Sequence, residues 1–220
     1  MGKVVLITGA SRGIGRALAE KFLEENYFVI GTSTSGKAEF SSKNLTFLKL
    51  DLSSTKSISA CVNSFKKLNK KIDILINNAG IAVEEEADSA IINSDYLRRT
   101  LEVNLIGTVY FMEKMIPSIN LGGQIVNISS KAGSLGSEEY TLNYPAYRIS
   151  KAGLNMVTKI LANRLKNSIK VSSIHPGSVQ TDMNPEATFS AKECAQDIYN
   201  RITTLKETGQ FWFKQDKYPW

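Results

Sequence analysis

The sequence predicts a doubly wound α/β fold, in which helices cover both faces of a parallel sheet of about seven strands. Short apolar runs alternate with helical patterns along the 220 residues. Alternation of this kind is typical of right-handed crossover units, which build parallel sheets. The length suits one substantial hydrophobic core, and the composition shows no break along the chain. We therefore expect residues 1–220 to form a single domain.

Six apolar runs predict strands, and five longer patterns predict helices. The strands are expected at Val4–Ile7, Phe28–Ile30, Leu45–Leu50, Ile72–Ile76, Gln124–Ile128 and Val171–Ile174. The helices are expected at Gly13–Glu24, Thr55–Leu68, Tyr96–Ile116, Pro145–Leu165 and Ala191–Leu205. In such sheets ligands bind beyond the carboxyl ends of the strands, so the segments after each strand should carry the function.

A glycine-rich segment follows the first expected strand and reads Thr8-Gly9-Ala10-Ser11-Arg12-Gly13-Ile14-Gly15. Gly9 permits a tight turn, Gly13 lets the backbone approach a pyrophosphate, and Gly15 allows the next helix to pack close to the sheet. The N-terminus of that helix offers free N–H groups and a positive dipole to phosphates. This pattern between a strand and a helix is typical of a dinucleotide-binding, Rossmann-type fold. A glycine-rich turn without a ligand is the alternative.

The end of the second strand indicates which dinucleotide binds. An acidic residue there would hold the ribose hydroxyls and repel a 2′-phosphate. This chain instead has Thr32 and Ser33 at that point, with Arg12 in the glycine-rich segment and Lys37 nearby. Because hydroxyls and cations suit a phosphate, NADP(H) is favoured over NAD(H). After the third strand, Asp51-Leu52 is placed to meet the adenine, although Asp51 could also cap the following helix.

The run Tyr147-Arg148-Ile149-Ser150-Lys151 predicts an acid–base pair. Side chains four residues apart on a helix lie on the same face. A nearby ammonium stabilises phenolate and lowers the pKa of the phenol from about 10 toward neutrality. Such a phenol can exchange a proton at physiological pH. Tyr140 and Tyr144 are rivals, but only Tyr147 has a lysine four residues further on.

These features occur in one order with Asn77-Asn78-Ala79-Gly80, Asn104, Ser130 and Pro176-Gly177. The combination, which runs from residue 4 to about residue 183, resembles the short-chain dehydrogenase/reductase family. The run Tyr144–Asn155, the segment Thr208–Phe213 and the closing Pro219-Trp220 resemble the sniffer and C-factor carbonyl-reductase subgroup.

The resemblance implies a role for each matching residue. Tyr147 would protonate a reduced carbonyl oxygen, Lys151 would hold the nicotinamide ribose, and Ser130 would hydrogen-bond the substrate carbonyl. Asn104 would anchor a water that links Lys151 to solvent. The cofactor would be held by Gly9, Ser11, Arg12, Gly13, Ile14, Gly15, Thr32, Ser33, Asp51, Leu52, Asn78, Ala79, Gly80, Tyr147, Lys151, Pro176, Gly177, Val179 and Thr181.

Two of these assignments have structural alternatives. Ser130 could simply satisfy backbone groups at a strand end, and Asn104 could cap or kink its helix. Sixteen residues separate Ser130 from Tyr147, more than the family usually has. We expect the surplus to form a surface loop within Gly133–Asn143. Ser134 would fit the usual spacing, but Ser130 is preferred because it ends the strand.

Composition narrows the functional classes. The net charge is +6, but the basic residues are scattered, so no nucleic-acid partner is expected. No apolar segment is long enough to suggest a membrane span, and no metal site is predicted. Cys61 and Cys194 lack a CxxC pairing and are expected to be buried free thiols, which fits the cytoplasm. His175, the only histidine, precedes Pro176 and is expected to be structural or to line a cleft.

The sequence therefore predicts a cytoplasmic, NADPH-dependent reductase of aldehydes or ketones. Two alternatives are an NAD-dependent alcohol dehydrogenase that works in the oxidative direction and an NADP-sensing regulatory protein with weak catalysis. A hydrophobic carbonyl substrate is suggested by Leu135, Tyr140, Tyr144 and Met183, in the expected lining segments Ile81–Ala87, Gly133–Pro145 and Asp182–Ala191. Members of the resembled family commonly form dimers or tetramers through their long helices, so the resemblance implies a homodimer or homotetramer. A monomer is the alternative, because small carbonyl reductases can be monomeric.

Overall fold

The order of the strands places a crevice between β1 and β4. The computed structural model describes residues 2–83, 85, 92–137, 143–182, 184 and 186–220. Within these residues the sheet has eight strands, in the order β3-β2-β1-β4-β5-β6-β7-β8. Their bounds are β1 Val4–Ile7, β2 Phe28–Ser33, β3 Leu45–Lys49, β4 Ile72–Asn77, β5 Ile119–Ile128, β6 Lys170–His175, β7 Gln210–Phe213 and β8 Asp216–Lys217.

All neighbouring strands pair in parallel except β7 and β8, which are antiparallel. The chain runs outward from β1 through β2 to β3 and then returns to place β4 on the other side of β1. Ile7 at the end of β1 therefore pairs with both Gly31 and Ile76. The loops after β1 and β4 diverge at this point, which is where open α/β sheets bind ligands. The predicted doubly wound fold is confirmed.

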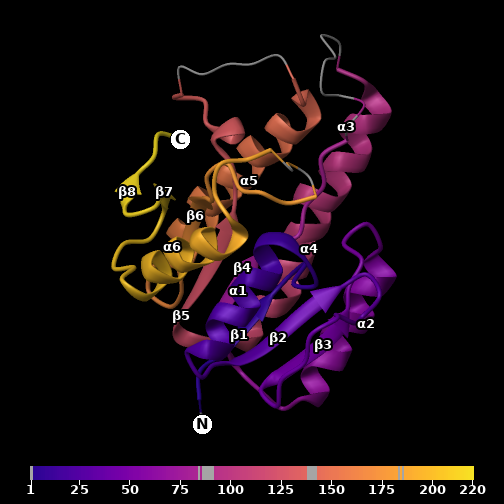
Figure 1. Cartoon of the computed structure of the whole chain (residues 1–220), viewed down its shortest axis with the longest axis vertical. Coiled ribbons are helices and arrows are strands. Elements are labelled where there is room, and N and C mark those ends of the chain that lie inside the picture. The colour runs from indigo at the N-terminus through magenta and orange to yellow at the C-terminus, as the bar shows by residue number, and fades with distance from the viewer. Residues whose placement is uncertain (1, 84, 86–91, 138–142, 183, 185) are drawn as a thin grey trace.

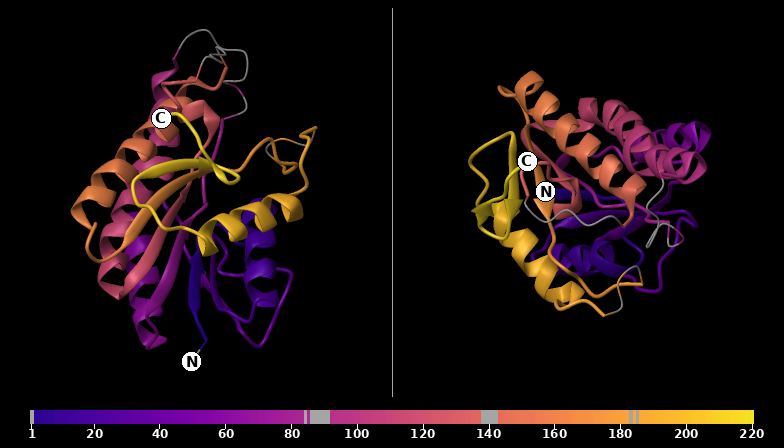
Figure 2. Two further views of the ribbon diagram at one scale, coloured as in Figure 1. Left: turned by 90° about the vertical axis from the view of Figure 1, so that its left-hand side faces the viewer. Right: turned by 90° about the horizontal axis from the view of Figure 1, so that it is seen from above.

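Helices cover both faces of the sheet (Figures 1 and 2). Helices α1 and α6 lie on one face, and α2, α4 and α5 lie on the other. On the first face, Phe22 of α1 and Ile198 of α6 join one apolar core, and on the second, Phe65 of α2 and Phe111 of α4 join another. The helix bounds are α1 Gly13–Glu24, α2 Thr55–Lys67, α3 Ser94–Leu101, α4 Thr108–Met115, α5 Pro145–Arg164 and α6 Ala191–Thr203. No helix in the described part of the chain has the length and apolar character needed to cross a membrane.

The single long helix expected over Tyr96–Ile116 is wrong in one respect. Helices α3 and α4 are separated by the π-helical segment η2, Glu102–Gly107. Gly107 lies against the backbone of Leu52, where a β-carbon would overlap the Leu52 carbonyl oxygen. The wider π turn also carries the buried Asn104. Such turns occur mainly at functional sites, and no periodicity in the sequence indicates this one.

At its C-terminal edge the sheet has two more strands than the apolar runs of the sequence predicted. Strands β7 and β8 were not among the six expected strands, and the short run around the buried Phe211 forms β7. Beyond β8, Trp220 stacks on Phe211 with ring centroids 5.6 Å apart. Ser134 Oγ donates a 2.8 Å hydrogen bond to the carbonyl oxygen of Pro219. The end of the chain therefore packs against the segment that follows Ser130.

Candidate functional site

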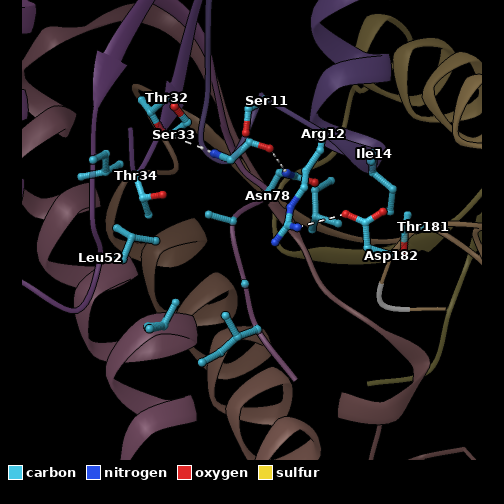
Figure 3. A pocket seen from close by; sticks show the side chains of 18 of the residues that line it. Ser11, Arg12, Ile14, Thr32, Ser33, Thr34, Leu52, Asn78, Thr181 and Asp182 are labelled. Carbon is cyan, nitrogen blue, oxygen red and sulfur yellow. Dashed lines mark hydrogen bonds and ion pairs between the residues drawn. The ribbon is translucent and has the colours of Figure 1, made fainter. Parts of the chain in front are cut away.

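A cavity of about 520 Å³ opens beyond the carboxyl ends of the central strands (Figure 3). Its volume is within the range of small-molecule and cofactor sites. Segments after six different strands, β1 to β6, contribute to its wall, as expected for a ligand site in this kind of sheet. The sequence-predicted residues on the wall are Gly9, Ser11, Arg12, Gly13, Ile14, Thr32, Ser33, Asp51, Leu52, Asn78, Ala79, Gly80, Tyr147, Lys151, Pro176 and Thr181.

The glycine-rich turn after β1 is closely packed. Gly9 has φ +66°, a left-handed conformation that favours glycine. A β-carbon on Gly15 would overlap the carbonyl oxygen of Gly9, so α1 can begin this close to the turn only without a side chain there. Asn78 Nδ2 donates to the carbonyl oxygens of Thr8 and Gly9, at 3.0 and 3.1 Å. Asn78 therefore ties the segment after β4 to the turn after β1.

This turn fits a dinucleotide phosphate group. Helix α1 begins at Gly13, which lies on the cavity wall with Ile14, and the side chain of the N-cap residue Arg12 does not cap the first N–H groups of the helix. Helix N-termini of this kind bind phosphate through free N–H groups and the helix dipole. At the other end of the cavity, a β-carbon on Gly80 would lie 3.2 Å from Asn104 Oδ1 and 3.6 Å from Lys151 Nζ, so glycine lets this part of the wall lie close to both side chains.

Hydroxyl groups line the end of β2. Thr32 Oγ1 accepts a 3.4 Å hydrogen bond from the N–H of Gly9, and Ser33 Oγ is paired with the backbone of Lys37. Arg12 is directed across the cavity mouth, where its Nη1 lies 3.0 Å from Asp182 Oδ2 (Figure 3). Both side chains of this ion pair are mostly exposed. The predicted phosphate-binding cation is therefore paired with a carboxylate in this structure.

Asp51 does not cap helix α2, so that structural alternative is wrong. The N-cap of α2 is Ser54, whose hydroxyl accepts from the N–H of Ser57. The Asp51 carboxylate instead accepts hydrogen bonds from the N–H and the hydroxyl of Ser53, at 2.9 and 2.6 Å. This local turn holds Asp51 at the cavity wall beside Leu52.

Helix α5 brings Tyr147 and Lys151 to the cavity together. Burial raises the pKa of the Tyr147 hydroxyl, and a hydrogen bond with Ser130 opposes that rise by lowering it. The expected net fall in the pKa of Tyr147 toward neutrality is therefore wrong for this structure, because the effect of burial is larger and raises that pKa. The ammonium of Lys151 lies 5.4 Å from the centroid of the Tyr147 ring, and burial lowers the pKa of Lys151 to about 8.

The side chain of Asn104 is fully used within the protein. Its Oδ1 accepts from the N–H of Ile81 at 2.8 Å, and its Nδ2 donates to the carbonyl oxygen of Ile81 and to Ser150 Oγ. Asn104 thus fastens the π turn to the segment after β4 and to helix α5. Asn104 is not one of the described residues that line the cavity. Asn104 lies within the π turn η2 and not at a helix cap, and both hydrogens of its side-chain amide are already donated to groups of the protein.

Five of the predicted residues are not part of the described cavity wall: Gly15, Gly177, Val179, Asn104 and Ser130. Val179 is buried in the core, and Gly177 has φ +89° with its α-carbon against Phe189. His175 is buried and stacks on Phe213, so its surroundings are structural. Ser130 meets the site through its hydrogen bond with Tyr147.

Some wall residues were missed by sequence reasoning: Thr34, Leu50, Ser53, Arg99, Val103, Ile128 and Ser129. Ile81 and Asp182 belong to segments that were expected to line the substrate side, and both are on the cavity wall. Arg99 and Val103 are four residues apart across the junction of α3 and η2. Their helical spacing is the signal that could have placed them on one face. The predicted substrate wall is only partly described, because Tyr140 and Met183 lie outside the described residues. Leu135 is 75% exposed, and Tyr144 has φ 55° just before α5.

The sequence and the fold match known proteins. The family model for short chain dehydrogenases matches residues 3–191. The chain belongs to the short-chain dehydrogenase/reductase family. A curated relative of this chain, the 3-oxoacyl-[acyl-carrier-protein] reductase FabG of Vibrio harveyi, is 36% identical over 193 residues, which is 83% of this chain and 75% of the relative.

Solved structures extend the similarity of this short-chain dehydrogenase/reductase to the whole chain. An NADPH-bound carbonyl reductase from chicken fatty liver is 25% identical with a TM-score of 0.90, and the match covers 100% of this chain and 94% of that one. The carbonyl reductase Sniffer of D. melanogaster is 25% identical with a TM-score of 0.87, with 100% of both chains covered. The family is one of oxidoreductases whose fold binds a nicotinamide cofactor.

Proposed function

We propose that this protein is an NADPH-dependent reductase of aldehydes or ketones. The arrangement of Ser130, Tyr147 and Lys151 carries the proposal: the Tyr147 hydroxyl is hydrogen-bonded to Ser130, and the Lys151 ammonium lies 5.4 Å from the centroid of the Tyr147 ring, with both Tyr147 and Lys151 on the cavity wall. A nicotinamide cofactor, when bound, supplies the hydride that a carbonyl carbon accepts. The protein's own part is to orient the carbonyl and to deliver a proton to its oxygen.

Tyr147 is the proposed proton donor. Because burial raises its pKa, the phenol keeps its proton at neutral pH, which is the form that a reduction requires. As the carbonyl oxygen gains negative charge, hydrogen bonds from Ser130 and Tyr147 stabilise that charge. The Lys151 ammonium adds positive charge beside the phenol and favours the phenolate that remains after proton transfer. Lys151, when charged, can also donate to a ribose hydroxyl.

We propose that the other predicted residues hold the cofactor or support the residues that react. The cofactor phosphates would lie over the turn from Gly9 to Gly15, and the adenine near Asp51 and Leu52. The nicotinamide end would lie between Gly80 and the segment from Pro176 to Thr181. Asn104 is proposed to support a proton relay only through the groups it holds in place, since its side chain is already bonded to Ile81 and Ser150.

The preference for NADP(H) is supported by the hydroxyl-lined end of β2. The residues there are Thr32, Ser33 and Thr34, none of which would repel a 2′-phosphate. Arg12 lies at the cavity mouth and is long enough to exchange Asp182 for a phosphate. An NAD-dependent dehydrogenase working in the oxidative direction is the competing function. Dissociation constants for the two cofactors decide between them, and tight NAD binding with weak NADP binding would overturn the proposal.

The activity is tested by NADPH oxidation with a panel of dicarbonyls, quinones and aromatic ketones. We expect turnover with hydrophobic members of the panel. Tyr147→Phe should bind NADPH as the wild type does and turn over slowly, because it lacks the proton to donate. Full activity of this variant would exclude the proposed role. A regulatory NADP sensor would show cofactor binding without turnover, and the presence of Ser130, Tyr147 and Lys151 together argues against it.

We further propose a homodimer in the cytoplasm. Four exposed apolar side chains lie on η2 and α5: Ile106, Ile149, Met156 and Ile160. Ile149, Met156 and Ile160 recur at a spacing that places them along one side of α5. Apolar side chains grouped in this way favour association. Light scattering at micromolar concentration should give twice the chain mass, and Met156→Glu should reduce the measured mass to that of one chain.

The two free cysteines, both buried, suit a reducing compartment such as the proposed cytoplasm.

A further inference from the structure

One buried amide holds both ends of the turn that carries Ser130. Ser129 Oγ donates a 2.7 Å hydrogen bond to Asn155 Oδ1, and Asn155 Nδ2 donates a 3.1 Å hydrogen bond to the carbonyl oxygen of Gly133. Both bonds are buried, and Asn155 is only 4% exposed. The residues immediately before and shortly after Ser130 are thus attached to the same side chain.

The turn between these two attachments is short and closed. Ser130 Oγ accepts from the N–H of Ala132 at 3.1 Å, and the Ser130 carbonyl oxygen accepts from the N–H of Gly133 at 3.0 Å. A β-carbon on Gly133 would lie 2.5 Å from the carbonyl carbon of Lys151. The turn therefore rests directly on the backbone of helix α5. A shift of either attachment would move the Ser130 hydroxyl with it.

The amide belongs to the same helical face as the two reacting groups. Tyr147, Lys151 and Asn155 are spaced by four residues along α5, so their side chains follow one another along one side of the helix. We propose that Asn155 is a positioning residue: it fixes the Ser130 turn against α5 and so sets the Ser130–Tyr147 hydrogen bond. This inference rests on the proposed reductase function.

The chemistry of the side chain matters because the two attachments are different. One requires an acceptor for the Ser129 hydroxyl, and the other requires a donor for the Gly133 carbonyl. The carboxamide of asparagine supplies both, through separate atoms and without a charge. Leucine has a similar volume and supplies neither, so it would leave a buried hydroxyl and a buried carbonyl unpaired.

Thr158 provides a matched control. It lies on the same helix three residues further on and is fully buried, with 0% exposure. Its hydroxyl accepts from Asn127 Nδ2 at 2.8 Å and is 2.8 Å from Ser173 Oγ, and it also donates to the Leu154 carbonyl. These bonds join α5 to strands β5 and β6 and do not involve the turn. Thr158→Val therefore removes a comparable buried hydrogen-bond group without releasing Ser130.

The test compares Asn155→Leu with Thr158→Val. We expect both variants to lose thermal stability, but only Asn155→Leu to lower kcat for carbonyl reduction, by about 10- to 100-fold. The dissociation constant for NADPH should stay within about twofold of the wild-type value in both variants. An unchanged kcat in folded Asn155→Leu would overturn the proposal, and so would an equal loss of kcat in Thr158→Val.

A second measurement does not depend on activity. The Tyr147 phenol of the cofactor-free protein can be titrated by the ultraviolet absorbance of tyrosinate, with Tyr147→Phe as the blank. Because the bond from Ser130 lowers the pKa of Tyr147, Asn155→Leu should raise that pKa and Thr158→Val should leave it unchanged. If the wild type reduces no carbonyl compound, the proposed function fails, while this titration still supports or overturns the positioning role.

A milder variant covers the case in which Asn155→Leu does not fold. Ser129→Ala deletes one hydroxyl and breaks only the first attachment. It should raise the pKa of Tyr147 in the same direction by a smaller amount and lower kcat by roughly threefold to tenfold. A pKa of Tyr147 equal to that of the wild type in Ser129→Ala would count against the proposal.

Discussion

The ammonium of Lys151 donates a 2.8 Å hydrogen bond to the carbonyl oxygen of Ile128, the last residue of β5. This bond joins the helix that carries Tyr147 to the strand that leads into Ser130. The site is therefore assembled around a lysine that is only 4% exposed. Burial lowers its pKa from 10.5 to about 8, so keeping it charged at neutral pH costs stability.

Lys151→Met should abolish carbonyl reduction and make the protein more resistant to heat at pH 7. The buried charge would be gone, although the Ile128 carbonyl would lose its partner, which offsets part of the gain. The net stabilisation should be on the order of 1 kcal/mol. Urea unfolding at pH 7 measures it, and a variant less stable than the wild type would contradict the prediction.

The same comparison should depend on pH in one direction. The folded lysine releases its proton at about pH 8, whereas the unfolded one holds it up to about pH 10.5. Between these values the unfolded state binds more protons, so the contribution of Lys151 to stability rises with pH. The amount by which Lys151→Met exceeds the wild type in free energy of unfolding should therefore decrease from pH 8 toward pH 10.5 and stay constant below pH 7.

Ser130→Ala should lower kcat by about 10²- to 10³-fold, because it removes a donor to the developing oxyanion. It should also raise the pKa of Tyr147, since the hydrogen bond with Ser130 lowers that pKa. Where Tyr147 acts as a base, in alcohol oxidation, the rising limb of the pH profile should move to higher pH. Ser134→Ala is the control, because its hydroxyl is bonded to Pro219 and should leave the profile in place.

Asp182→Asn should tighten NADPH binding and leave NADH binding unchanged. The Arg12–Asp182 pair spans the cavity mouth, and a 2′-phosphate would have to displace the carboxylate. Because the pair is highly exposed, its loss should change the dissociation constant by no more than about fivefold. Fluorescence titration of both cofactors measures this. Asp216→Asn, on the exposed strand β8, is the matched control, and equal tightening in the control would exclude the mechanism.

Gly15→Ala should remove cofactor binding and destabilise the fold, because its β-carbon would overlap the Gly9 carbonyl oxygen. Gly122→Ala is a useful contrast. Gly122 has φ +80° but open space around it, so alanine there should cost only about 1 kcal/mol of backbone strain and leave binding intact. Thermal melts with and without NADPH separate the two effects, and cofactor-dependent stabilisation of Gly15→Ala would contradict the first prediction.

Local patterns predicted most of the fold. Strands β1 to β6 and the helices around the sheet follow from apolar runs and helical spacing, and their ends differ by a few residues. Strand β5 begins at Ile119, whereas the prediction began at Gln124. Gly122 and Gly123 are typical of a turn, so no pattern in the sequence indicated that Ile119 pairs with Ile72. Pairing with a distant strand leaves no periodic signal of its own in a short segment.

The site was predictable where chemistry depends on residue type and short spacing. The glycine-rich turn and the Tyr147–Lys151 pair are of this kind. The Arg12–Asp182 pair joins residues 170 positions apart, and the sequence contains no sign of it. The direction of the Tyr147 pKa was missed for a similar reason, because spacing reveals a neighbouring charge but does not reveal how deeply the hydroxyl is buried.

The approach of Thr181 to Gly13 has a consequence for folding. The Thr181 methyl carbon lies 3.3 Å from the place where a β-carbon of Gly13 would be, so the cavity is complete only when the first and last thirds of the chain have met. A ligand that bridges them binds the folded state alone and stabilises the chain by mass action. Cofactor at a hundred times its dissociation constant should add about 2.7 kcal/mol to the free energy of unfolding. Because the ligand contacts both parts of the chain, the whole sheet should unfold in one transition that moves to higher temperature.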